Sequence, residues 1–186
     1  MQNYRIGLGD LPPEGKEFVL DDPAIWLEPL KEFHMDCRVR KPLRATISVT
    51  PVEDGWLVRG SLEGEVALPC SRCAEDAITP LAARFEDFES LPEEPEPEAP
   101  RRHAAQEPTP AGERLVWERG ALLLDLAAVC WEEFVLALPP TPLCQEGCKG
   151  LCARCGANLN AGPCGCPPEE GDPRLAVLRG LVRRGK

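Results

Sequence analysis

The run from Cys144 to Cys166 constrains this chain more than any other stretch, because it holds six of the ten cysteines. The six follow the spacing C-x3-C-x3-C-x2-C-x8-C-x-C, at Cys144, Cys148, Cys152, Cys155, Cys164 and Cys166. A thiolate pair two residues apart can chelate one Zn²⁺ through a tight turn, and two pairs complete a tetrahedral sulfur cage. Leu151 and Leu159 are the only sizeable aliphatic side chains between the ends. A segment so poor in apolar mass needs a metal to fold.

Six cysteines exceed the four ligand positions of one zinc ion, so two stay unassigned at this point. Cys152 and Cys155 are the best-supported ligands. The alternative is a disulfide-stapled loop of the kind found in small secreted modules. Zinc is favoured because the opening residues lack the apolar h-region of a signal peptide, and thiols stay reduced in the cytosol. All-thiolate zinc sites are usually closed, which predicts a structural role for the metal.

A further pair, Cys70-Ser-Arg-Cys73, is expected at the tip of a β-hairpin. It allows a second metal site, a redox pair or two packed thiols. A thioredoxin-like motif needs a βαβ context, which the surrounding pattern does not offer. Cys130, on an apolar helix face, is expected in the core.

The apolar periodicity predicts an α+β fold. In 43–50 and 56–68, apolar and polar residues alternate with a period of two, which is typical of antiparallel strands with one solvated face. We expect strands in 1–20, 43–50, 56–68, 77–88 and 114–118, and helices in 22–33 and 121–138. One antiparallel sheet of about five or six strands would be covered by the helix at 121–138, with a small Cys-rich zinc-binding appendage at the C-terminal end.

We expect two parts, 1–140 and 141–186. The first is interrupted by a linker at 89–113, whose 25 residues include six prolines and seven glutamates, too little apolar mass to fold. The second ends in a helix capped by Asp172-Pro173. That helix carries the cations Arg174, Arg179, Arg183 and Arg184 with no acidic residue. These cations either complement the helix C-terminus or contact a phosphate, RNA or another partner.

The net charge, 21 − 31 = −10, argues against a general nucleic-acid binder and favours basic partners. Phosphate-binding loops, HExxH and G-x-S-x-G are absent, and the two histidines are poorly placed for a general base. The most apolar run, 121–138, is interrupted by Asp125, Glu132 and Glu133, so no membrane span is expected. We therefore expect a cytoplasmic protein that is not an enzyme.

Several motifs together resemble the YceD family, also called large ribosomal RNA subunit accumulation proteins. They are Cys70-Ser-Arg-Cys73, Cys148-Lys-Gly-Leu-Cys152-x-x-Cys155-Gly-Ala-Asn-Leu-Asn160, Cys164-x-Cys166 and Asp172-Pro-Arg-Leu-Ala176. The resemblance implies a factor whose loss affects large-subunit rRNA accumulation, and it implies no catalytic residues. It leaves open whether RNA or a ribosomal protein is the direct ligand.

Because ribosomal proteins are small and strongly basic, an acidic protein suits the role of their escort. The hypothesis is that this chain holds a basic ribosomal protein, or docks on an assembling large subunit through one. An RNA-binding assembly factor that uses the helix from Arg174 is the first alternative. A redox enzyme that uses Cys70 and Cys73 is the second.

Overall fold

The computed structural model describes residues 4–91 and 114–167, which form two antiparallel sheets and two α-helices. The larger sheet has the order β2-β3-β4-β5, from Lys16–Leu20, Arg38–Val52, Gly55–Pro69 and Asp76–Ser90. The smaller sheet has the order β1-β7-β6, from Arg5–Gly7, Ala121–Asp125 and Leu115–Glu118. The helices are α1 (Ala24–Glu32) and α2 (Leu126–Ala137), and a short 3₁₀ helix, η1, spans Leu8–Asp10. The α+β class predicted from the sequence is confirmed.

Three strands of 15 residues, β3, β4 and β5, form the body of the larger sheet. As the alternation predicted, the apolar side chains of β3 are buried at Leu43, Ala45, Ile47 and Val49. Gly60 on β4 permits a close approach, because a Cβ there would lie 2.3 Å from Cζ of Phe85 on the neighbouring strand. The tip of the β4–β5 hairpin carries Cys70 and Cys73, at the place expected.

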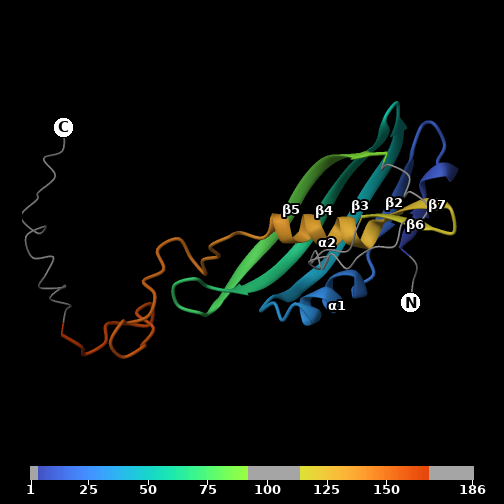
Figure 1. Ribbon diagram of the computed structural model, residues 1–186. Helices are drawn as coiled ribbons and strands as arrows, with labels where there is room; N and C mark the ends of the chain where they lie inside the picture. The colour runs from blue at the N-terminus through green and yellow to red at the C-terminus, as the bar shows by residue number, and fades with distance from the viewer. Residues whose placement is uncertain (1–3, 92–113, 168–186) are drawn as a thin grey trace, which may run out of the picture.

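Both helices lie on the same side of the larger sheet, and the core fills the space between them (Figure 1). Trp131 of α2 stacks on Phe134 and on Phe33, which follows α1, with ring centroids 5.5 and 5.7 Å apart. The largest side chains with almost no exposure come from both sheets and both helices: Trp26, Phe134, Ile47, Leu62, Leu124, Val49, Val58, Val66, Val129 and Cys130. Cys130 is therefore a core residue, as predicted.

The prediction of one helix over 121–138 was wrong in its first part, since 121–125 form β7 and the helix begins at Leu126. Arg119 and Gly120 have φ values of 52° and 80°, so they form the two-residue turn of a β6–β7 hairpin. Asp125 then caps α2 by accepting hydrogen bonds from the amides of Ala127 and Ala128. Because β7 pairs with β1 and β6, these three strands form a second sheet, and the prediction of a single sheet was wrong.

Smaller differences concern α1 and the linker. Pro29 lies inside α1 without ending it, and the helix continues to Glu32. Since proline has no backbone N–H, the helix lacks one backbone hydrogen bond at this position. β5 extends to Ser90, so the first residues assigned to the linker belong to the sheet. The rest of that linker, 92–113, and the basic stretch with Arg174, Arg179, Arg183 and Arg184 lie outside the described residues.

Candidate metal centres

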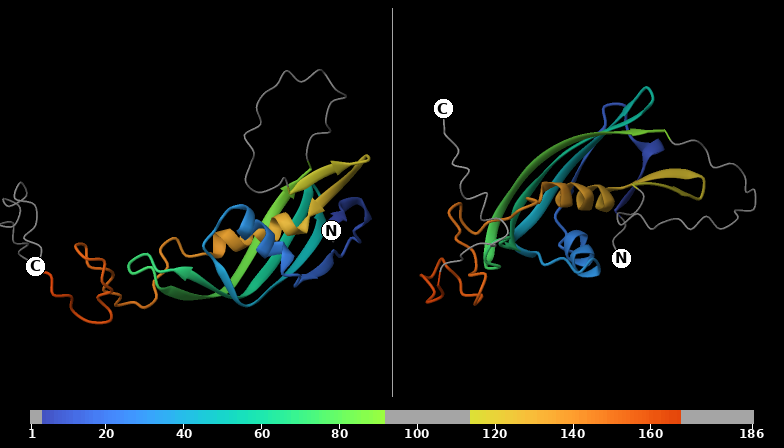
Figure 2. Two further views of the ribbon diagram at one scale, coloured as in Figure 1. Left: turned by 90° about the horizontal axis from the view of Figure 1, so that it is seen from below. Right: turned by 60° about the vertical axis from the view of Figure 1, so that its left-hand side comes forward.

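Eight of the cysteines form two groups of four in the described part of the chain. The inner group contains Cys70, Cys73, Cys144 and Cys148, and the outer group contains Cys152, Cys155, Cys164 and Cys166. Within each group all four sulfur atoms lie within 4.8 Å of one another. Cys70 and Cys73 lie in the loop of the β4–β5 hairpin, and the other six cysteines lie in the segment that follows α2. That segment runs past the β4–β5 hairpin at one end of the larger sheet (Figure 2).

The inner group joins the β4–β5 hairpin to the segment after α2. The Sγ atoms of Cys70 and Cys148 are 3.8 Å apart, and those of Cys73 and Cys144 are 3.5 Å apart. Four sulfurs placed 2.3 Å from one tetrahedral metal ion are separated from each other by about 3.8 Å. A disulfide needs about 2.05 Å between its sulfur atoms, and all ten cysteines are free. The spacing and the donor chemistry therefore fit a metal ion better than disulfides.

A tight turn in the hairpin loop positions Cys70 and Cys73. The amide of Cys70 donates to the carbonyl of Glu75 (2.8 Å), and the amide of Ala74 donates to the carbonyl of Cys70 (2.9 Å). Ala74 has a positive φ of 60°, which reverses the chain directly after Cys73. The backbone amide of Arg72 also points at the Cys70 sulfur, 3.5 Å away. This geometry aims both sulfur atoms at the same point.

Hydrogen bonds hold the segment that carries Cys144 and Cys148 against the β4–β5 hairpin. The amide of Ser71 donates to the carbonyl of Pro142 (2.8 Å), and the Arg72 guanidinium donates to the carbonyl of Cys148 (2.8 Å). Gly150, with a φ of +75°, allows the chain to pass the hairpin closely, since a Cβ there would lie 3.0 Å from the Arg72 carbonyl oxygen. The segment after α2 is thus held against the hairpin around the sulfur atoms.

Asn160 supports the inner group from the outer loop. Its side-chain amide donates to the Cys148 sulfur (3.3 Å), while its carbonyl oxygen accepts from the amide of Lys149 (2.8 Å) and from Gln145 (3.1 Å). A hydrogen bond to a sulfur ligand orients it and stabilises its thiolate form. Consistent with this contact, the Asn160 hydrogen bond lowers the pKa of Cys148. Residue spacing alone did not identify this role, although Asn160 belongs to the motif that carries the family resemblance.

The outer group is built on a turn of its own. The amide of Gly156, whose φ is 71°, donates to the carbonyl of Cys152 (2.9 Å), and the amide of Cys152 donates to Ala157 (2.8 Å). The backbone amides of Cys155 and Arg154 lower the pKa of Cys152 to about 6. Cys155 is exposed, whereas Cys70, Cys73 and Cys148 are buried. The outer group is therefore the more accessible of the two.

This grouping accounts for all the cysteines left open by the sequence. Cys144 and Cys148 lie with Cys70 and Cys73, so the six cysteines of the C-terminal run divide between two groups. The two remaining cysteines, Cys37 and Cys130, are buried elsewhere, and burial raises the pKa of Cys37 to about 11 and of Cys130 to about 12. Each group offers four sulfur atoms and could hold one metal ion.

Comparison with known proteins gives the following matches. A family model described as "Large ribosomal RNA subunit accumulation protein YceD" matches residues 58–182, which include both cysteine groups. The chain is 27% identical over 198 residues to a maize protein named "Large ribosomal RNA subunit accumulation protein YCED homolog 1, chloroplastic". That alignment covers 96% of this chain and 66% of the maize protein, so the chain spans about two thirds of that relative.

Two more relatives match shorter parts of the chain. An Arabidopsis thaliana protein of the same name is 44% identical over 46 residues, covering 25% of this chain and 14% of the relative. An uncharacterised protein of Mycobacterium tuberculosis is 29% identical over 134 residues, covering 71% of this chain and 58% of the relative. No solved structure matches the chain. In the described residues, no helix is both long enough and apolar enough to cross a membrane.

Proposed function

Because this chain belongs to the YceD family, we propose that it is a non-enzymatic ribosome biogenesis factor supporting the accumulation of large-subunit rRNA. It acts in the cytoplasm by binding a basic ribosomal protein, or the assembling large subunit through such a protein. The family match over residues 58–182 is the observation that carries this proposal.

The charge of the chain supports a protein as the direct ligand. A net charge of −10 on 186 residues repels phosphate backbones at long range and attracts the strongly basic proteins of the ribosome. Electrostatic complementarity of this kind speeds association and suppresses wrong partners. An escort needs both properties and needs no catalytic group.

Zn²⁺ in both cysteine groups is the second part of the proposal. Four thiolates at tetrahedral spacing are a typical donor set of structural zinc. The metal would supply no chemical step. In the inner group it would hold the segment after α2 on the β4–β5 hairpin, and in the outer group it would hold together a loop with little apolar mass.

Binding to large-subunit proteins tests the escort proposal. The zinc-loaded protein, immobilised, is mixed at low salt with proteins extracted from purified bacterial large subunits, and retained proteins are identified by mass spectrometry. We expect retention of a small basic ribosomal protein, and we expect its affinity to fall as salt rises because ionic attraction is screened. No retained basic protein, or a complex indifferent to salt, contradicts the escort proposal.

Direct RNA binding is the second candidate, favoured by the cluster of cations at Arg174, Arg179, Arg183 and Arg184. The test is retention of rRNA by wild type and by a variant in which Arg179, Arg183 and Arg184 are replaced with Ala. If RNA is the ligand, the wild type retains rRNA, the variant does not, and the salt dependence becomes weaker. Equal behaviour of the two proteins excludes these three arginines as an RNA contact.

A further inference from the structure

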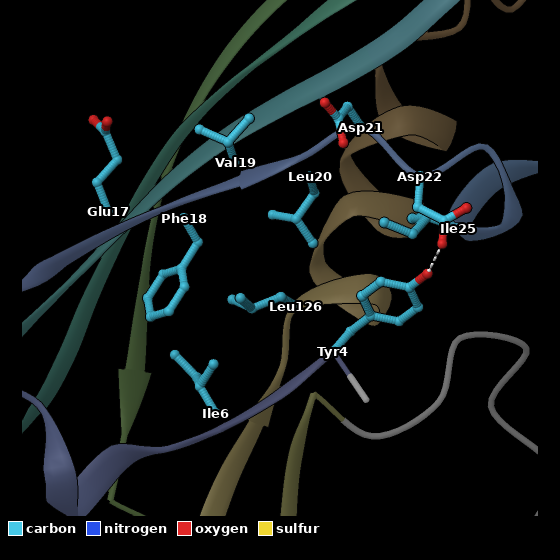
Figure 3. Close-up of a pocket in the computed structure, with 10 residues that line it drawn as sticks. All are labelled: Tyr4, Ile6, Glu17, Phe18, Val19, Leu20, Asp21, Asp22, Ile25 and Leu126. Carbon is cyan, nitrogen blue, oxygen red and sulfur yellow. Dashed lines mark hydrogen bonds between the residues drawn. The ribbon is translucent and has the colours of Figure 1, made fainter. Parts of the chain in front are cut away.

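A cavity of about 400 Å³ lies between the edge strands of the two sheets. β1 is the edge of the smaller sheet, and β2 pairs with β3 and with no other described strand. Figure 3 shows Phe18 and Leu20 of β2 pointing toward Ile6 and Leu126, so apolar side chains line one part of the space between the strands. An unpaired strand edge beside a partly apolar cavity is an arrangement that accepts an added strand.

Acidic groups surround this apolar space, and none of the residues that line it is a cation. The carboxylates belong to Glu17, Asp21 and Asp22. Asp22 is already engaged, because it accepts from the Tyr4 hydroxyl and from the amide of Ala24. Glu17 and Asp21 are exposed, and no ion pair between described residues involves either of them.

The neighbouring strand does not neutralise Glu17, which lies opposite the uncharged Ser48 in the β2–β3 pair. Asp21 directly follows the last paired residue of β2, Leu20, which lies opposite Ala45. Three residues lie between Glu17 and Asp21, which directly follows β2, so four steps of extended chain place them about 13 Å apart. Val19, half exposed at 49%, points to the same side of β2 as Glu17 (Figure 3). The edge therefore presents a row of acid, apolar residue and acid.

From this row we infer that β2 is the docking edge for an extended basic segment of the partner, which adds as a strand. In that segment two cations four residues apart face Glu17 and Asp21, because opposite charges across a strand pair are stabilising. Between the two cations, the residue that follows the first and the residue that precedes the second are apolar. Their side chains enter the cavity beside Phe18 and Leu20. The recognised pattern is cation, apolar, any residue, apolar, cation.

Charge also argues for a basic partner over a second copy of this chain. An antiparallel pair of two β2 strands brings Glu17 of one copy toward Asp21 of the other, and like charges across a pair are destabilising. This inference rests on the proposed function and specifies where the basic ribosomal protein binds.

A pair of capped peptides tests the docking edge on the full zinc-loaded chain. The probe has the sequence Lys-Val-Thr-Val-Lys, and its control, Val-Lys-Thr-Lys-Val, has the same composition with cations and apolar residues on exchanged faces. NMR titration is expected to show shifts of the backbone amides of β2 and slower amide exchange there with the probe. We expect at least tenfold weaker binding of the control. Equal binding of both peptides overturns the inference.

A second test of the docking edge reverses the charge of its two acidic residues. Glu17→Lys together with Asp21→Lys is expected to weaken probe binding at least tenfold. The matched control, Glu53→Lys with Asp54→Lys, makes the same change of net charge at exposed positions in the β3–β4 turn, away from the cavity, and is expected to stay within twofold. If the Glu17/Asp21 variant retains the basic ribosomal protein as the wild type does, the docking edge is wrong and the proposed function stands. If the wild type itself retains none, both are overturned.

Discussion

The sulfur atoms of Cys70 and Cys148 lie 3.8 Å apart although 78 positions separate the two residues in sequence. The contact closes a loop that includes β5, β6, β7 and α2, so it ties the tip of the larger sheet to the chain after the last described helix. A metal ion bound at this point would link distant parts of the chain, as a disulfide would in an oxidising compartment.

Zinc content gives the first prediction. We expect two Zn²⁺ ions per chain in the protein purified without chelator, because each cysteine group offers four sulfur ligands. Cys70→Ser removes one ligand of the inner group and is expected to reduce the count by one. Cys130→Ala changes a buried core thiol outside both groups and is expected to leave the count unchanged. Elemental analysis after gel filtration measures the ratio, and loss of zinc from Cys130→Ala contradicts the grouping.

Release of the metal is expected to occur in two phases. The outer group includes the exposed Cys155, whereas three of the four inner cysteines are buried, so a chelator reaches the outer site first. A chromogenic chelator should show a fast and a slow phase of equal size. Cys155→Ser is expected to abolish the fast phase alone. A single phase in the wild type argues against two sites of different accessibility.

Asn160 is expected to strengthen the inner site through its hydrogen bond to the Cys148 sulfur. Asn160→Ala should lower the zinc affinity of that site by about 10- to 100-fold, the usual effect of removing a group that supports a metal ligand. Competition with a chelator of known affinity measures the change. Gln145→Ala is the matched control, since the Gln145 side chain donates to the carbonyl oxygen of Asn160 and leaves the contact of Asn160 with sulfur in place. A similar loss in both variants would mean that Asn160 acts through loop packing.

Glu133 predicts a dependence of stability on pH. It shares Arg114 with Asp87, Glu89 and Glu132, and burial followed by the charge of Asp87 raises its pKa. A raised pKa means that the folded state binds this proton more tightly than the unfolded state, so stability is lost as pH rises through the folded pKa. Glu133→Gln has no such loss.

The stability of this variant relative to wild type is therefore expected to improve between about pH 4.5 and pH 7. Urea denaturation of the two proteins at both pH values measures the difference, in which the pH sensitivity of the metal sites cancels. A difference that is constant with pH, or that moves the other way, is incompatible with a raised pKa for Glu133.

The local pattern of apolar residues predicted much of the fold. It failed where the same pattern is typical of both a strand and a helix. The alternation in β3 and β4 is specific to strands, so both were found in the correct place. The run 121–124 is short and uniformly apolar, which suits a buried strand as well as a helix turn. The informative signals were the Arg119-Gly120 turn before it and the Asp125 cap after it.

The partition of the cysteines depends on long-range contacts that spacing does not encode. Cys152 and Cys155 stand two residues apart and were recognisable as ligands from sequence. Cys144 and Cys148 have a spacing that suits either group, and their place beside Cys70 follows from how the segment after α2 returns to the hairpin. The division into one buried and one exposed group is a property of the fold.

Native mass spectrometry of the protein isolated from cells, without chelator and at low salt, tests the central claim most directly. An acidic zinc-dependent escort predicts a species that contains this chain, two zinc ions and one small basic ribosomal protein, and that dissociates as salt is added. A species that contains rRNA and no ribosomal protein, or a metal-free chain with its cysteines in disulfides, contradicts that claim.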